Sequence, residues 1–157
     1  MNLVFNEPVS IGQFFERFDD GEKGKRELIQ SMGSREILRV LDGVGRSWKS
    51  GRRREKAMEI LRETSGLSES TMAEGLDMLP EILSRSVLER RIVAELGGDF
   101  LDGWGRGPVD GVELFAAPLG SLLHVLAGNA FVSGVESLVN GIVTKNLNVV
   151  KVSSSDR

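Results

Sequence analysis

The hydrophobic period changes twice near the end of the chain, and this pattern constrains the fold more than any other feature. The run SLLHVL, residues 121–126, is apolar and of strand length, and the AGN at 127–129 is a turn signal. Apolar residues from Phe131 to Val143 then recur at helical spacing, and LNVVKV, residues 147–152, reads as a second strand. Two strands joined by a helix within about thirty residues predict a parallel βαβ unit.

Small and polar residues give more detail on how the predicted helix of this unit packs and where it ends. Gly134 and Gly141 lie on one side of the predicted helix, where missing side chains would let it sit close to a sheet. Lys145 and Asn146 suit the helix end, because a cation complements the C-terminal dipole and Asn tolerates a left-handed conformation. His124 is the only histidine and lies in an apolar strand, so we expect packing or a backbone hydrogen bond rather than proton transfer.

Residues 1–96 are predicted to form a helical region of short amphipathic segments. Ser34 is a candidate N-cap, a helix is expected over 53–64 with Gly66 just beyond it, and Ser68 is a candidate N-cap for the next helix. Pro80 is expected to open another turn. The last helix of the region is expected to bury Leu83, Val87, Leu88 and Ile92.

A glycine-rich linker, residues 97–111, separates this region from residues 112–157, and residues 112–116 are a possible strand. Six glycines and Pro108 in the linker favour a loop or hinge, which we expect Trp104 to anchor. The spacing of its aspartates does not match a calcium loop, so no metal site is predicted. The expected fold class is α/β, a helical N-terminal region followed by an incomplete, Rossmann-like parallel βαβ unit.

Composition excludes several classes of protein. The chain is 40% hydrophobic and 27% charged, and no apolar run approaches the ~20 residues that span a membrane. It has no cysteine, which excludes disulfides and a thiolate nucleophile within it, and its first residues do not resemble a secretory signal, so we expect a cytoplasmic protein. The net charge of −3 argues against nucleic-acid binding, and we interpret Arg52–Arg54 with Lys56 as a solvated helix start.

Ligands of parallel α/β sheets bind where the chain leaves the carboxyl ends of strands. Asn129 follows the first predicted strand, and Lys151, Ser153 and Ser154 lie at the end of the second. The amide of Asn129 could donate to a developing oxyanion, or it could simply be a helix N-cap. Lys151 could reach only water, or with the adjoining serines it could hold a ribose or phosphate.

The run GSLLHVLAGNAFVSGVESLVNGIVTKNLNVVKVSSSD resembles the corresponding stretch of the LuxC-type acyl-CoA reductases, or long-chain fatty-acyl-CoA reductases, of the aldehyde dehydrogenase superfamily. The ETSGLSES turn and the AELGG helix end resemble the family's N-terminal part more weakly. The resemblance implies the opening of a nucleotide-binding domain of aldehyde dehydrogenase type. It also implies NADPH-dependent reduction of a fatty acyl-CoA or other acyl thioester to the aldehyde through an acyl-cysteine. In luminous bacteria that aldehyde feeds luciferase.

The resemblance also implies roles for individual residues. Asn129 occupies the place of the superfamily's asparagine in Pro-Trp-Asn, which helps hold the thiohemiacetal oxyanion. Lys151 matches the lysine of Lys-Pro-Ser-Glu, which reaches the adenosine ribose. Val152 replaces the proline, and Ser154 stands where the glutamate would bind ribose hydroxyls. Without that carboxylate nothing repels a 2′-phosphate, so NADP suits this sequence at least as well as NAD.

The resemblance implies a site that is completed elsewhere. Because the chain contains no cysteine, the acyl-enzyme must form outside it, and we expect this chain alone to be inactive. Two strands covered by one helix leave a sheet edge and a sheet face without partners, so we expect a homo-oligomer or a missing C-terminal part. The alternative is a non-catalytic interaction module that binds a partner through the exposed sheet edge and an apolar helix face.

Overall fold

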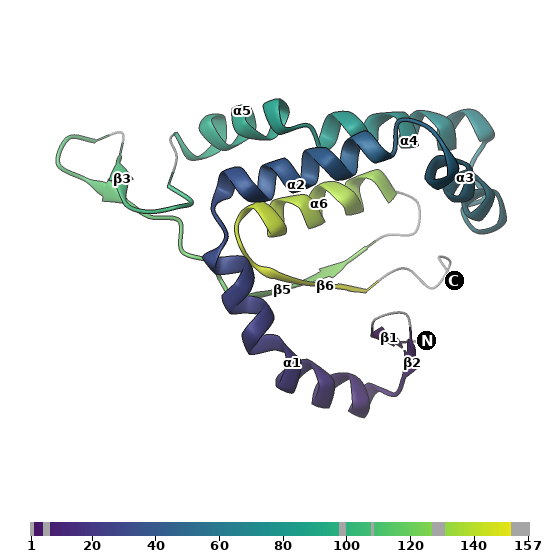
Figure 1. Ribbon diagram of the computed structural model, residues 1–157, viewed down its shortest axis with the longest axis horizontal. Coiled ribbons are helices and arrows are strands. Elements are labelled where there is room, and N and C mark those ends of the chain that lie inside the picture. The colour runs from purple at the N-terminus through teal and green to yellow at the C-terminus, as the bar shows by residue number, and fades with distance from the viewer. Residues whose placement is uncertain (1, 5–6, 98–99, 108, 127–130, 152–157) are drawn as a thin grey trace.

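A computed structural model describes residues 2–4, 7–97, 100–107, 109–126 and 131–151, and it is mostly helical with a few small strands (Figure 1). The helices are α1 (Ile11–Ser31), α2 (Ser34–Ser47), α3 (Arg52–Thr64), α4 (Glu69–Ile82), α5 (Arg85–Leu96) and α6 (Phe131–Val143). The strands are β1 (Asn2–Val4), β2 (Glu7–Val9), β3 (Gly105–Arg106), β4 (Glu113–Leu114), β5 (Ser121–Val125) and β6 (Leu147–Lys151). The fold is therefore α/β in general, with most of its mass in helices.

Local sequence signals set several helix ends as predicted. Ser68 is the N-cap of α4, and its hydroxyl oxygen accepts the Thr71 backbone N–H at 3.2 Å. Beyond the C-cap of α3, Gly66 has a φ of +63°, a left-handed value that glycine adopts without strain. α5 likewise ends at Gly97, with a φ of 75°. These caps satisfy backbone groups that a helix end would otherwise leave unpaired.

Three predicted helix positions are wrong. Ser34 is the first residue of α2 and not its N-cap, since the Asp102 carboxylate accepts its backbone N–H. Pro80 lies inside α4, whose last turn packs so closely on α2 that a Cβ on Gly45 would lie 2.9 Å from Leu83 Cβ. Leu83 is the C-cap of α4, so it is not part of the helix that follows.

One hydrophobic core joins the N-terminal helices to the C-terminal part. α6 contacts both α2 and α4, and Figure 1 shows it alongside α2. The core therefore holds the βαβ unit against the helical layer through α6. Its buried cluster consists of Ile37, Leu38, Leu41, Leu83, Leu88, Leu101, Val139 and Val143.

The pairing of β5 with β6 is parallel, which confirms the predicted βαβ unit. The register sets Val125 opposite Lys151, so the carboxyl ends of the two strands lie side by side. α6 packs closely on these strands, as its glycines predicted, since a Cβ on Gly134 would lie 2.8 Å from Leu126 Cδ1. The other face of β5 is open, with Leu123 67% exposed, so the apolar run has one covered side and one exposed side.

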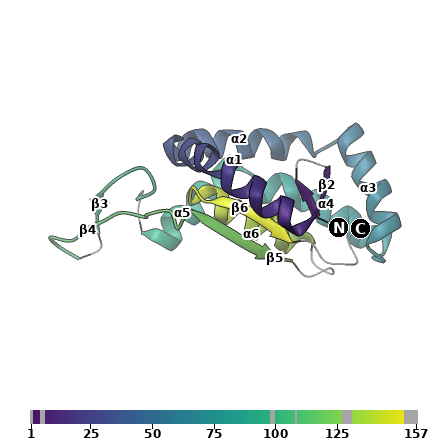
Figure 2. The ribbon, with the colours of Figure 1, turned by 90° about the horizontal axis from the view of Figure 1, so that it is seen from below.

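The predicted linker supplies only one strand of a short hairpin, in which β3 pairs antiparallel with β4, and β4 lies in the segment 112–116 that was predicted as a possible strand. Figures 1 and 2 both show this hairpin projecting away from the helices. Trp104, the predicted anchor, is 73% exposed and its ring lies 5.7 Å from that of Phe115. The anchors are instead the buried Phe100 and Leu101, and the Ala116 N–H donates to the Phe100 carbonyl at 3.0 Å.

Candidate functional site

The carboxyl ends of β5 and β6 form the edge at which the sequence predicts ligand-binding residues. Lys151 ends β6 and is exposed, and its carbonyl accepts the Leu126 backbone N–H at 3.0 Å. The first turn of α6 lies at the same edge, because Gly134 packs against the Leu126 side chain. A strand end that carries Lys151 and a helix start therefore lie at the same edge. Phosphate groups bind at such helix starts in α/β proteins.

The other predicted site residues, Asn129, Ser153 and Ser154, lie outside the described residues. Asn129 belongs to the segment 127–130 that joins β5 to α6, and the two serines follow Lys151 directly. The roles of these three side chains stay predictions.

A polar network that the sequence analysis missed holds α6 on the strands. His124 Nδ1 lies 2.8 Å from Ser137 Oγ, and His124 Nε2 lies 2.7 Å from Asn148 Oδ1. Because the Asn148 amide nitrogen donates to the Asn146 carbonyl, its Oδ1 accepts the Nε2–H of His124. In the neutral imidazole, Nδ1 then accepts the Ser137 hydroxyl. His124 packs against Gly141 of α6, in keeping with the predicted packing, and the bonds to its ring come from two side chains and not from the backbone group that was the predicted alternative.

A sequence signal for this network did exist. Ser137 lies three residues after Gly134 and four before Gly141, on the helix side that the glycines predicted would face the sheet. A Cβ on Gly141 would lie only 1.9 Å from Asn148 Oδ1, so the network needs a glycine there. With both ring nitrogens engaged, His124 positions the helix beside the candidate edge.

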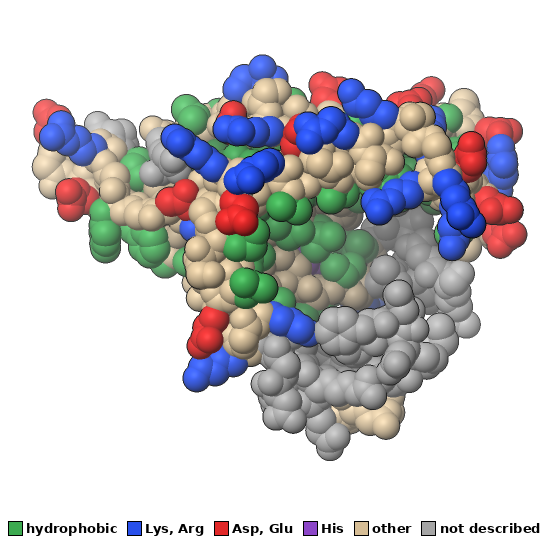
Figure 3. All heavy atoms as spheres, viewed as in Figure 1, with side chains coloured by type: hydrophobic (Ala, Val, Ile, Leu, Met, Phe, Trp, Pro, Cys, Tyr) green, Lys and Arg blue, Asp and Glu red, His purple; other side chains and the backbone are tan. Residues whose placement is uncertain are grey.

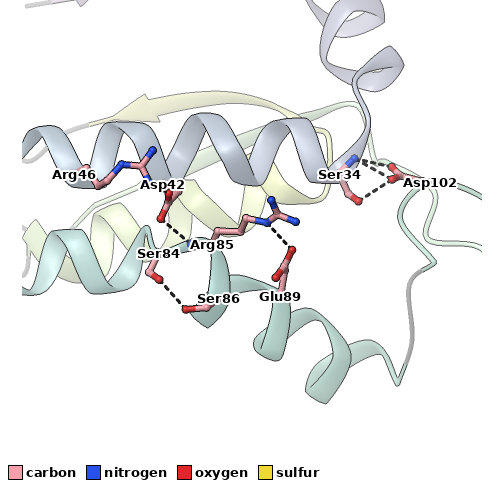
Figure 4. A network of polar contacts seen from close by, with 8 residues as sticks. All are labelled: Ser34, Asp42, Arg46, Ser84, Arg85, Ser86, Glu89 and Asp102. Carbon is pink, nitrogen blue, oxygen red and sulfur yellow. Dashed lines mark hydrogen bonds and ion pairs between the residues drawn. The ribbon is translucent and has the colours of Figure 1, made fainter.

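Asp102 joins the start of α2 to the end of α6, and Figure 4 shows its contact with Ser34. Its carboxylate accepts the Ser34 backbone N–H at 2.8 Å and the Ser34 hydroxyl at 2.7 Å, as well as the Lys145 ammonium at 2.6 Å. Burial alone would raise the pKa of Asp102, but the hydrogen bonds from Lys145 and Ser34 and the lysine charge outweigh it, so the pKa is lowered. We call these three residues the Asp102 clamp.

The Asp102 clamp also corrects the predicted end of α6. Lys145, and not Asn146, adopts the left-handed conformation, with a φ of 59°. Its side chain is only 9% exposed and pairs with Asp102 instead of simply complementing the helix dipole. Asn146 instead binds the residue that precedes β5: its Oδ1 accepts the Gly120 backbone N–H at 2.9 Å. The backbone strain at Lys145 is therefore held by a long-range ion pair.

The basic run at the start of α3 is largely solvated, as interpreted from the sequence. Arg53 donates to Ser47 Oγ at 3.1 Å, and Arg54 pairs with Asp77 at 2.8 Å. These contacts tie α3 to α2 and α4.

An apolar groove of about 450 Å³ lies between α1, α2, α4 and α6. Figure 3 shows hydrophobic side chains gathered between α2 and α1 on this face. Every residue that lines the groove is apolar, and Val40 and Val44 on its α2 wall are exposed. The sequence analysis missed it because helical spacing identifies an apolar stripe but not the gap left between four packed helices.

Similarity to known proteins shows which family has this sequence. Residues 29–157 match the family described as acyl-CoA reductase (LuxC). The chain belongs to this family. It is 32% identical over 143 residues to the long-chain acyl-protein thioester reductase of Photobacterium phosphoreum, a match that covers 88% of this chain and 29% of that protein.

Other members of the family give the same result. The long-chain acyl-protein thioester reductase of Photorhabdus laumondii is 34% identical over 124 residues, which cover 76% of this chain and 25% of that protein. The Vibrio harveyi protein of the same name is 30% identical over 134 residues, covering 83% of this chain and 28% of the relative. The LuxC family chain thus spans less than a third of these relatives' length. No solved structure matches it significantly.

The composition and geometry of the described residues bear on two other roles, a membrane span and a metal site. None of their helices has the length and apolar character needed to cross a membrane. The same residues contain no group of three His, Asp or Glu side chains arranged to hold a metal ion.

Proposed function

We propose that this chain forms the opening part of a nucleotide-binding domain of aldehyde dehydrogenase type, in an enzyme that reduces a fatty acyl thioester to the aldehyde with NADPH. Membership of the LuxC family and the names of its relatives, which are long-chain acyl-protein thioester reductases, support the reaction class. The observation that carries the proposal is the parallel pairing of β5 and β6, which ends in an exposed Lys151 opposite Val125.

The donor set at this edge suits a phosphorylated nucleotide. Lys151 contributes an ammonium, and Ser153 and Ser154 contribute hydroxyls, which bind ribose or phosphate oxygens. No carboxylate occurs at residue 153 or 154 to repel a 2′-phosphate, which favours NADP, with NAD as the weaker ligand. When bound, the reduced cofactor supplies hydride to the acyl carbonyl.

Asn129 is proposed to act on the substrate. A side-chain amide at the head of α6 can donate to the oxygen that gains charge when a thioester carbonyl becomes tetrahedral. The LuxC family chain contains no cysteine, so the thiol that carries the acyl group must belong to another part of the enzyme. Incubation of this chain with tetradecanoyl-CoA and NADPH should therefore oxidise no NADPH, and measurable turnover would contradict this assignment.

Direct titration tests the nucleotide site. The purified chain should bind NADPH saturably, and Lys151→Ala should weaken binding about tenfold or more, because a charged hydrogen bond is lost. Lys49→Ala, at an exposed lysine beyond α2, is the matched control and should change affinity less than twofold. Ser154→Glu should weaken NADPH more than NADH. The proposal fails if NADPH does not bind, or if both lysine variants bind alike.

The alternative of an interaction module is favoured by one observation, the open face of β5 with Leu123 exposed. In that case the chain would form a stable complex with a partner chain through this face, and sedimentation would show that Leu123→Glu dissociates the complex. Neither the parent chain nor the Leu123→Glu variant would bind NADPH.

A further inference from the structure

We infer that the apolar groove between α1, α2, α4 and α6 binds the alkyl chain of a long-chain acyl group. The inference rests on the proposed function for its substrate class, but its location rests on the groove itself. The groove is concave, and its volume of about 450 Å³ falls within the ~300–1,000 Å³ of typical ligand pockets. The exposed Val40 and Val44 leave its α2 wall open to water, so an apolar occupant would be stabilised there.

The lining of the groove selects an alkyl chain over a loop or strand. A peptide segment brings backbone N–H and C=O groups that must find partners when they are buried. Apart from the indole N–H of Trp48, the side chains that line this groove, such as Ile29 and Leu83, carry no polar atoms to meet them. An alkyl chain brings no such groups and needs only apolar contact. An amphipathic helix from a second copy is the remaining occupant, and the experiment below distinguishes it.

The position of the groove relates it to the reaction edge. Val135, in the second turn of α6, lines one end together with Val44 and Trp48 at the end of α2. Figure 1 shows the end of α2 and the start of α6 on the same side of the molecule. Ile142 lines the groove seven residues later, about 10 Å further along α6. An acyl chain can therefore extend away from the candidate edge with its carboxyl end toward the start of α6.

Chain length provides the sharpest test, because each buried methylene should raise affinity about fourfold. Octanoic, decanoic and tetradecanoic acids are titrated into the Trp104→Phe chain, in which Trp48 is the remaining tryptophan and reports groove occupancy by fluorescence. Affinity should rise steeply with length. Tetradecanoyl-CoA should compete with tetradecanoic acid, and coenzyme A alone should not.

Rim variants locate the binding. Val44→Glu and Val40→Glu, at exposed positions that tolerate a charge in the folded chain, should each weaken tetradecanoic acid binding at least tenfold. Val93→Glu, at an exposed valine on α5 outside the groove, is the matched control and should bind like the parent. Circular dichroism should show the same helix content in all three, and a variant that loses it is replaced by the other rim variant.

Three outcomes overturn the inference: no saturable binding, equal affinity for octanoic and tetradecanoic acids, or equal loss in the rim and control variants. A chain that dimerises without binding fatty acid, and that Val44→Glu makes monomeric, assigns the groove to a second copy instead. NADPH is titrated in parallel. If the chain binds NADPH but no fatty acid, this inference alone is overturned. If it binds fatty acid but no NADPH, the nucleotide site alone is overturned.

Discussion

Removal of the Asp102 carboxylate should destabilise the chain more than removal of its lysine partner. Asp102→Ala leaves the Lys145 ammonium, whose side chain is 9% exposed, without its counter-ion, and leaves the Ser34 N–H and hydroxyl without their acceptor. Breaking a buried ion pair from one side costs about 3–5 kcal/mol. The Asp102 side chain is 39% exposed, so water replaces part of the loss and we expect about 2–3 kcal/mol.

Lys145→Met should lower the free energy of unfolding less than Asp102→Ala does. It removes the buried charge, fills the space with an apolar side chain, and leaves Asp102 bonded to Ser34, so we expect a loss of about 1 kcal/mol. Urea unfolding followed by circular dichroism measures both changes, and the double variant gives the coupling energy. The reasoning is refuted if Asp102→Ala lies within about 0.5 kcal/mol of the parent, or if Lys145→Met costs more than Asp102→Ala.

Two further predictions follow from the same structure. Because the folded pKa of Asp102 lies below its ordinary 3.8, its contribution to the free energy of unfolding is full above that pH and declines as the pH falls through the lowered folded pKa. The acid limb of stability should therefore be flatter in Asp102→Asn, and an identical limb in both proteins would argue against it. Gly141→Ala should cost about 2 kcal/mol or more in urea unfolding, since its Cβ would lie 1.9 Å from Asn148 Oδ1. Gly24→Ala meets nothing within 4 Å in α1 and should stabilise by about 0.5–1 kcal/mol, so a loss in both would contradict the packing argument.

Patterns confined to neighbouring residues predicted much of this fold. The spacing of apolar residues changes from that of a strand to that of a helix and back again around α6, which predicted the parallel βαβ unit. Gly134 and Gly141 indicated which side of the helix faces the strands. The candidate edge followed from the same unit, because parallel strands end together, and Lys151 lies at that edge. Cap signals at Ser68 and Gly66 succeeded because each acts within one or two turns.

Features set by distant partners could not be predicted in this way. Asp102 is 68 residues from Ser34 and 43 from Lys145, so no local signal shows that it shifts one helix start and holds a left-handed lysine at another helix end. The His124 network joins three elements, and the groove needs four helices. Their existence depends on tertiary packing, which a periodic pattern specifies only as a face and not as a partner.

One side of α6 packs on the strands, and another side lines the apolar groove. Gly134, Ser137 and Gly141 face the strands, where even one added methyl group would collide with neighbouring atoms at the glycines. Val135 and Ile142 line the groove instead. Mutations that change the depth of the groove therefore need not disturb the strand contacts, so the groove can change shape while the geometry at the sheet stays fixed.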